Sequence, residues 1–170
     1  MAERERGRVR EREFYEQIIA AQRADRERSF TGEVIIRGRH RPWELSRQGL
    51  VRNYMQPSCY TGRKVDTALD GWIVFTQEVK VHSGKHRHQG GLVIYVIEGR
   101  GYSVVDDERV EWEAGDLLLL PIKPKGVVHQ HFNHAPGEPC LWIAFIHMPI
   151  MDYVSMEMTQ IESMPEFKEK

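Results

Sequence analysis

The chain has few cysteines, no marked excess of charge of either sign and no long apolar run. Its two cysteines, Cys59 and Cys140, stand far apart and lack metal-ligand spacing, which favours two ordinary thiols over a disulfide. Lys and Arg number 24 against 25 Asp and Glu, so we expect no nucleic-acid partner. No apolar stretch is long enough to cross a bilayer, and we expect no membrane partner.

Residues 1–29 are predicted to form a charged N-terminal helix. The opening residues are charged where a signal peptide needs an apolar stretch, which predicts a cytoplasmic location. Phe14, Ile18 and Ala21 recur on one helix face, while Glu–Arg pairs can support the solvated side. We expect this helix to pack on the rest of the domain or on a partner subunit. An RNA-binding arm is the alternative, and the interleaved glutamates argue against it.

The sequence after residue 29 predicts one all-β domain, because short strand-like segments alternate with Gly, Asp and Pro turns. Residues 30–70 suggest irregular strands and loops, with strands at Glu33–Ile36 and Val51–Tyr54. Residues 71–150 form the predicted barrel core, and 151–170 a C-terminal tail. The core contains seven predicted strands: Trp72–Val81, Leu92–Ile97, Tyr102–Val105, Arg109–Trp112, Leu117–Leu120, Val127–Phe132 and Cys140–Ile146.

Histidines form the most informative pattern. His86 and His88 are two residues apart, so in a strand both imidazoles point to one face. A third ligand must come from elsewhere, and His129 opens a second His-x-His with His131. Neutral imidazole binds Fe, Zn, Ni, Cu and Mn to differing degrees. By itself, however, the first His-x-His fits a solvated surface pair equally well.

The residues around these histidines resemble the two motifs of the cupin family. The first resemblance lies in His86–His88 and Tyr95–Gly99. The second motif resembles Gly115-Asp116, Pro121 and then Pro124-x-Gly126-x-x-His129-x-x-x-Asn133, with the second proline three positions after the first. The resemblance covers roughly the last hundred residues. It implies a single cupin double-stranded β-helix, a jelly-roll barrel, with His86, His88 and His129 as metal ligands.

The usual first cupin motif also supplies a glutamate ligand, but Leu92 and Val93 occupy those positions here. We therefore expect three histidines and no carboxylate around the metal. A neutral ligand set leaves the full charge of the ion for water, oxygen or an anionic substrate. An open coordination face is typical of catalytic rather than structural sites. A site that has lost its function is the alternative.

The segment 86–121 is most similar to the gentisate and salicylate ring-cleaving dioxygenases. That resemblance implies Fe(II), with Mn, Ni, Zn or Cu as alternatives, together with O2 and a small aromatic, phenolic substrate. By position it implies two catalytic residues, His131 as acid/base and Gln77 as a substrate-side glutamine. We also expect a homodimer or higher homo-oligomer.

Two positions depart from that pattern. Ile94 stands where the family carries an Arg that holds the substrate carboxylate, and Ala144 stands where an Asp orients the second histidine. We therefore predict a phenol or hydroquinone without a carboxylate, or another small enolisable substrate. His131, at an ordinary pKa of about 6.5, would accept the phenolic proton. A metal-dependent lyase or isomerase and a non-catalytic metal or small-ligand sensor remain as other hypotheses.

Overall fold

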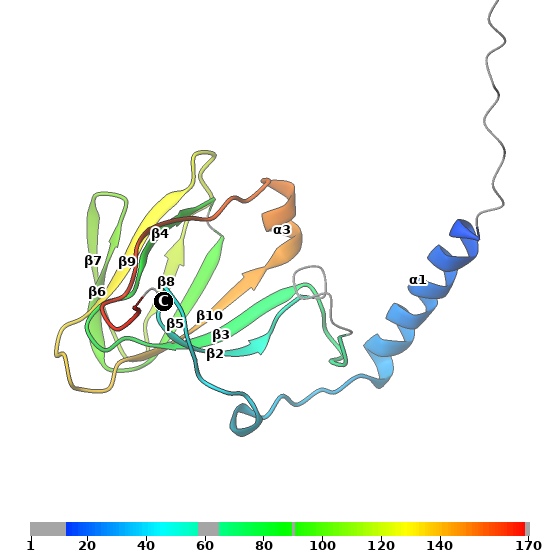
Figure 1. Cartoon of the computed structure of the whole chain (residues 1–170), viewed down its shortest axis with the longest axis horizontal. Helices are drawn as coiled ribbons and strands as arrows, with labels where there is room; N and C mark the ends of the chain where they lie inside the picture. The colour runs from blue at the N-terminus through cyan, green and yellow to red at the C-terminus, as the bar shows by residue number, and fades with distance from the viewer. Residues whose placement is uncertain (1–12, 58–64, 90, 169–170) are drawn as a thin grey trace, which may run out of the picture. The chain divides into compact units, whose positions relative to one another are not determined.

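The computed structural model describes residues 13–57, 65–89 and 91–168, and these fall into two compact units. One unit comprises the residues through Val34 together with Asp66–Leu69 and contains the helix α1, Phe14–Thr31. The other comprises Ile35–Val65 and Asp70–Lys170 and contains the strands (Figure 1).

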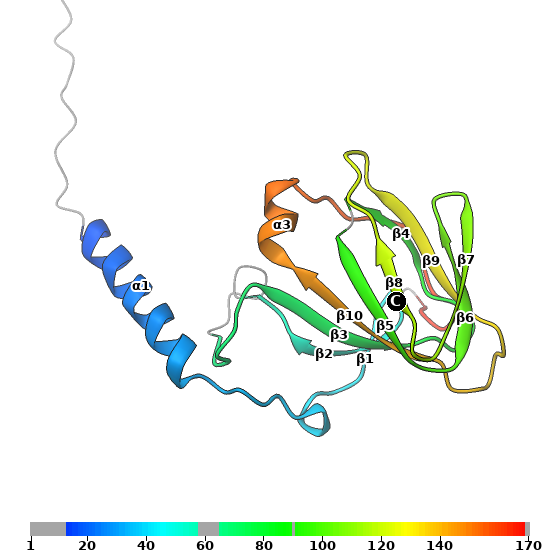
Figure 2. The same cartoon turned by 180° about the vertical axis from the view of Figure 1, so that it is seen from behind.

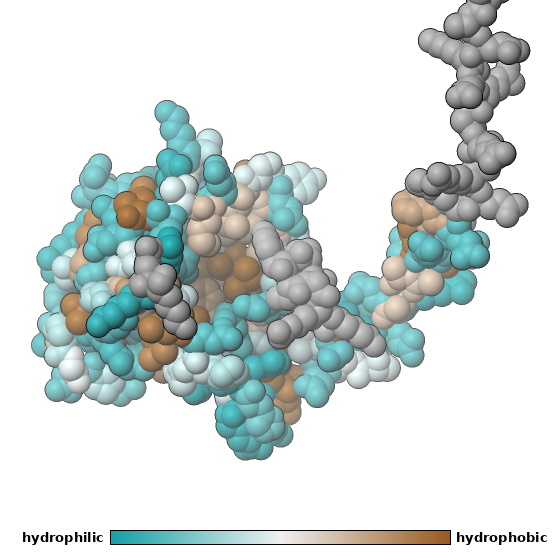
Figure 3. Space-filling view, in the orientation of Figure 1, coloured by the Kyte–Doolittle hydropathy of each residue, from teal (hydrophilic) through white to brown (hydrophobic). Residues whose placement is uncertain are grey.

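The first unit contains a helix over part of the predicted range 1–29, because α1 begins at Phe14 and ends at Thr31; residues 1–12 lie outside the described part of the chain. No residue of α1 is buried, and apolar and polar side chains lie side by side on it (Figure 3). The predicted strand Glu33–Ile36 is wrong. Glu33 makes a single isolated bridge with Thr67, which is too short a pairing to form a strand, and Val34 is 85% exposed.

The second unit consists of two antiparallel sheets facing each other, the jelly roll expected from the sequence (Figures 1 and 2). The six-stranded sheet has the order β1 (Glu44–Leu45), β2 (Leu50–Met55), β3 (Trp72–Glu78), β10 (Leu141–His147), β5 (Leu92–Glu98) and β8 (Leu117–Leu120). The five-stranded sheet has the order β11 (Thr159–Glu162), β4 (Lys85–His88), β9 (Val127–Asn133), β6 (Arg100–Val105) and β7 (Glu108–Glu113).

Strict alternation of side chains builds the core between the sheets. On β5 the inward residues Leu92 and Ile94 are buried, whereas Tyr95 is 42% exposed, as the alternation predicts. The short helix α3 (Met148–Tyr153) adds Met148 and Met151 to the same core. One further short element, the 3-10 helix η1 (Gly38–His40), precedes β1 in the sequence.

All seven strands predicted within residues 71–150 are present, with ends that differ by up to three residues. Residues 151–170, the predicted tail, contribute β11, which pairs with β4 and so completes the five-stranded sheet. Cys140 is a buried free thiol, and burial raises its pKa to about 11; Cys59 lies outside the described residues. Within the described ranges, no helix is both long and apolar enough to span a bilayer.

Candidate metal site and adjoining cavity

The pairing of β4 with β9 brings the three predicted ligands together. The burial pattern of β4 turns His86 and His88 inward and Arg87 outward. His86 lies directly opposite His129 on β9 in the antiparallel ladder. Directly opposed residues are the closest cross-strand neighbours in a sheet. The predicted i, i+2 pair and the later histidine therefore share one face.

The three imidazoles form a compact buried cluster. The ring centroids of His86 and His129 are 4.1 Å apart, and those of His88 and His129 are 4.8 Å apart. One nitrogen from each ring can be chosen so that all three lie within 4.8 Å of one another. The exposed fractions of the three residues are 7%, 2% and 1% for His86, His88 and His129. Such a cluster can present three nitrogens to one ion.

Backbone carbonyls orient two of these rings. Nδ1 of His86 lies 3.4 Å from the carbonyl oxygen of Gly84, and Nδ1 of His129 lies 3.2 Å from that of Val127. A carbonyl only accepts, so each Nδ1 carries the hydrogen and Nε2 is left with a free lone pair. Nε2 of His129 is buried and has no hydrogen-bond partner in the described chain. A side chain on Gly84 would clash with the backbone oxygens of Arg47 and Glu162, so glycine is needed there.

Burial keeps the three rings uncharged. It lowers the pKa of His86 to about 4, and burial together with the nearby His86 lowers the pKa of His88 to about 4. The pKa of His129 is lowered well below its usual value, first by burial and then by the neighbouring histidines. Neutral imidazoles are the form that coordinates metals. Three uncharged imidazoles, together with a buried His129 Nε2 that has no hydrogen-bond partner in the described chain, therefore fit a divalent transition metal.

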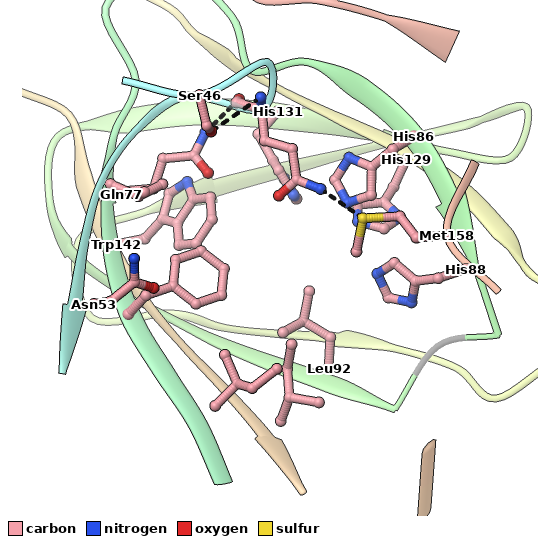
Figure 4. A pocket seen from close by; sticks show the side chains of 15 residues that line it. Ser46, Asn53, Gln77, His86, His88, Leu92, His129, His131, Trp142 and Met158 are labelled. Carbon is pink, nitrogen blue, oxygen red and sulfur yellow. Dashed lines mark hydrogen bonds between the residues drawn. The ribbon is translucent and has the colours of Figure 1, made fainter. Parts of the chain in front are cut away.

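A cavity of about 190 Å³ adjoins the triad between the two sheets (Figure 4). Both residues predicted to be catalytic, Gln77 on β3 and His131 on β9, line it. Apolar side chains form much of its wall: Val51, Ile73, Phe75, Leu92, Trp142 and Ile146. Ile94 is not one of the residues that line the cavity; its side chain is buried in the apolar core.

His131 is held by a chain of hydrogen bonds that crosses three strands. Ser103 on β6 lies opposite His131 on β9, and its Oγ is 2.7 Å from Nδ1 of that ring. Trp112 on β7 donates from Nε1 to the same Oγ over 2.9 Å. All three side chains are buried, Ser103 completely.

This chain of bonds fixes which nitrogen of His131 carries the hydrogen. The indole of Trp112 can only donate, so Ser103 accepts from it. Of the two described partners of Ser103 Oγ, only Nδ1 of His131 can accept, so the one hydroxyl hydrogen of Ser103 goes to that nitrogen. A hydroxyl that donates to Nδ1 leaves the ring hydrogen on Nε2.

The prediction that His131 has an ordinary pKa is wrong. Burial, together with His86 and His88, lowers its pKa to about 3. The ring is therefore neutral across the usual pH range, and Ser103 already occupies its accepting nitrogen. His131 can offer a hydrogen bond from Nε2–H to an oxygen in the cavity.

Sequence reasoning missed Ser103 and Trp112 as partners of His131. Ala144 does stand where an orienting acid was expected, and its methyl group is fully buried in the core. The orientation of His131 comes instead from β6 and β7. A usable signal was Gly101, where any side chain would clash with the Trp112 ring and the Phe132 carbonyl. A glycine inside a strand often marks such a close approach.

Comparison with known proteins agrees with this architecture. Residues 74–146 match the family model described as a cupin domain. These residues form a cupin domain. The match spans β3 through most of β10 and includes all three histidines of the triad.

Relatives of the cupin domain include dioxygenases. A gentisate 1,2-dioxygenase of Ralstonia sp. is 36% identical over 70 residues, covering 41% of this chain and 19% of that protein. An acireductone dioxygenase of Yarrowia lipolytica is 32% identical over 80 residues, covering 42% of this chain and 44% of that protein. The chain thus spans less than half of either relative.

A solved structure shares the fold. The salicylate 1,2-dioxygenase of Pseudoaminobacter salicylatoxidans aligns with a TM-score of 0.52 and 18% identity. The alignment covers 87% of this chain and 35% of that one. At this identity the likeness establishes the cupin fold and leaves the activity to the residues of the site.

Proposed function

We propose that this protein is a metal-dependent dioxygenase that acts on a small phenolic or related aromatic molecule, with Fe(II) as its metal. The observation that carries the proposal is the triad of neutral imidazoles beside a mostly apolar cavity. The dioxygenase activity of the curated relatives supports the reaction class.

His86, His88 and His129 would hold the ion, because their rings are neutral, buried and close enough to share it. Bound iron would supply the redox chemistry with O2 and a positive charge that favours an ionised phenolic oxygen. Three protein ligands leave coordination positions for small molecules. The apolar wall would exclude water from the bound substrate.

His131 and Gln77 would act on the substrate from the cavity wall. With Nδ1 held by Ser103, His131 would donate from Nε2–H to a substrate oxygen and stabilise negative charge on it. Gln77, anchored to the backbone of Gln48, would position the part of the substrate away from the metal.

Metal analysis of the anaerobically purified protein, followed by oxygen consumption, tests the proposal. We expect Fe(II)-loaded protein to consume O2 with at least one member of a panel of catechols, hydroquinones and gentisate. His88→Ala should abolish this uptake, whereas His134→Ala, a histidine outside the triad, should not. Tight metal binding with non-oxidative conversion of substrate would instead support a lyase or isomerase.

A further inference from the structure

The cavity beside the triad has three different walls. One carries the histidines, a second is apolar, and the third carries four uncharged polar residues from β3 and the β1–β2 region: Ser46, Gln48, Asn53 and Gln77. No Asp, Glu, Lys or Arg lines this cavity among the described residues. Neither Arg47 nor Lys125, the cations nearest in sequence to the wall and to His129, belongs to the lining.

Two amide side chains on the polar wall have a fixed orientation. Nε2 of Gln77 donates to the backbone oxygen of Gln48 over 3.1 Å. Nδ2 of Asn53 donates to the carboxylate of Glu44 over 3.0 Å. Turning either amide would set its oxygen against another acceptor oxygen, so the nitrogens point away from the cavity and the oxygens toward it (Figure 4).

Close packing keeps Gln77 in this position. The residue is only 2% exposed, and a side chain on Gly49 would clash with its amide. The backbone oxygen of Gln48 also accepts from the amide of Gly84 over 2.7 Å, which joins this wall to the strand that carries His86.

The remaining polar atoms of the wall belong to uncharged groups. The Ser46 hydroxyl donates to the Gly49 oxygen and accepts from the backbone amides of Gln48 and Gly49. Nε2 of Gln48 faces the sulfur of Met158 over 3.0 Å. Nε1 of Trp142, also buried in the wall, has no hydrogen-bond partner among the described residues. The polar wall therefore presents amide oxygens but no charged group.

From this arrangement we infer that the substrate carries a hydroxyl or amino group, and no carboxylate, at the end away from the metal. Such a group would donate to the oxygens of Gln77 and Asn53. A carboxylate in the same place would meet amide oxygens and no cation to offset its loss of water. The inference deepens the proposed function and depends on it only for the end of the substrate that faces the metal.

Binding to the zinc-loaded full chain tests the inference without requiring turnover. Calorimetric titration would compare three phenols that differ only at the position opposite the hydroxyl: hydroquinone, 4-methylphenol and 4-hydroxybenzoate. We expect hydroquinone to bind about tenfold more tightly than 4-methylphenol, the worth of one hydrogen bond. 4-Hydroxybenzoate should bind more weakly than both.

Substitutions at Gln77 in the polar wall test whether this residue causes the preference for hydroquinone. Gln77→Leu should remove most of the preference for hydroquinone, while Gln77→Arg should favour 4-hydroxybenzoate. Thr76→Val serves as the matched control, because Thr76 is buried on the opposite face of β3 and should leave the preference unchanged. Equal or tighter binding of 4-hydroxybenzoate to the unmodified chain would overturn the inference. Loss of zinc binding would instead count against the proposed function.

Discussion

Four buried histidines line the same cavity, but the hydrogen-bond partner of Nδ1 is not the same in all of them. His86 and His129 lie near backbone carbonyls through Nδ1, which leaves lone pairs on Nε2. His131 lies beside the Ser103 hydroxyl, which leaves a hydrogen on Nε2. The partner of Nδ1 thus distinguishes His129, a proposed metal ligand, from His131, a proposed hydrogen-bond donor two residues along the same strand.

The largest expected effect is on the ligand side of this comparison. His86→Ala, His88→Ala and His129→Ala should each lower metal affinity by more than about a hundredfold, since losing even an outer partner of a ligand costs about 10–100-fold. Elemental analysis after dialysis measures the occupancy. Full occupancy in any one variant would exclude that histidine from the ligand set.

On the donor side, His131→Ala should keep the metal and lose turnover. Removing one preorganised donor to a developing oxyanion costs about 10²–10³ in kcat. Steady-state oxygen consumption at matched metal content is the measurement. A variant that retains its metal and the wild-type kcat would show that His131 has a structural role only.

Disrupting the chain of bonds behind His131 should have a smaller effect. Ser103→Ala leaves Nδ1 without its donor, so both neutral tautomers become accessible and kcat should fall by about tenfold, the worth of one hydrogen bond. Trp112→Phe removes only the outer bond and should cost less. An effect of Trp112→Phe larger than that of Ser103→Ala would contradict this order.

The last prediction concerns the pH dependence of stability. Because burial lowers the pKa values of His86 and His88 to about 4, the unfolded chain takes up protons below pH 6.5 that the folded chain does not. The free energy of unfolding of the metal-free protein should therefore fall as pH drops from 6.5 to about 4, by up to about 1.4 kcal/mol per pH unit for each histidine. Urea titrations across this range measure it. A stability that rises toward pH 4 would contradict buried neutral rings.

The sequence predicted the cluster of His86, His88 and His129 better than the hydrogen-bond partners of His131. The two-residue period of a strand places His86 and His88 on one face, and the cupin motifs supply His129, so local spacing was enough. The bonds from Trp112 to Ser103 and on to His131 depend on the register of β6, β7 and β9. No spacing within the sequence encodes that register, and β11 beside β4 was missed because its short segment has no strong alternation.

Ring-nitrogen NMR of the zinc-loaded protein with 15N-labelled histidine tests the central comparison most directly. We predict that the rings of His86 and His129 are metal-bound at Nε2 with the hydrogen on Nδ1, and that His131 is neutral and unbound with its hydrogen on Nε2. A metal-bound His131, an imidazolium, or a hydrogen on its Nδ1 would contradict the account.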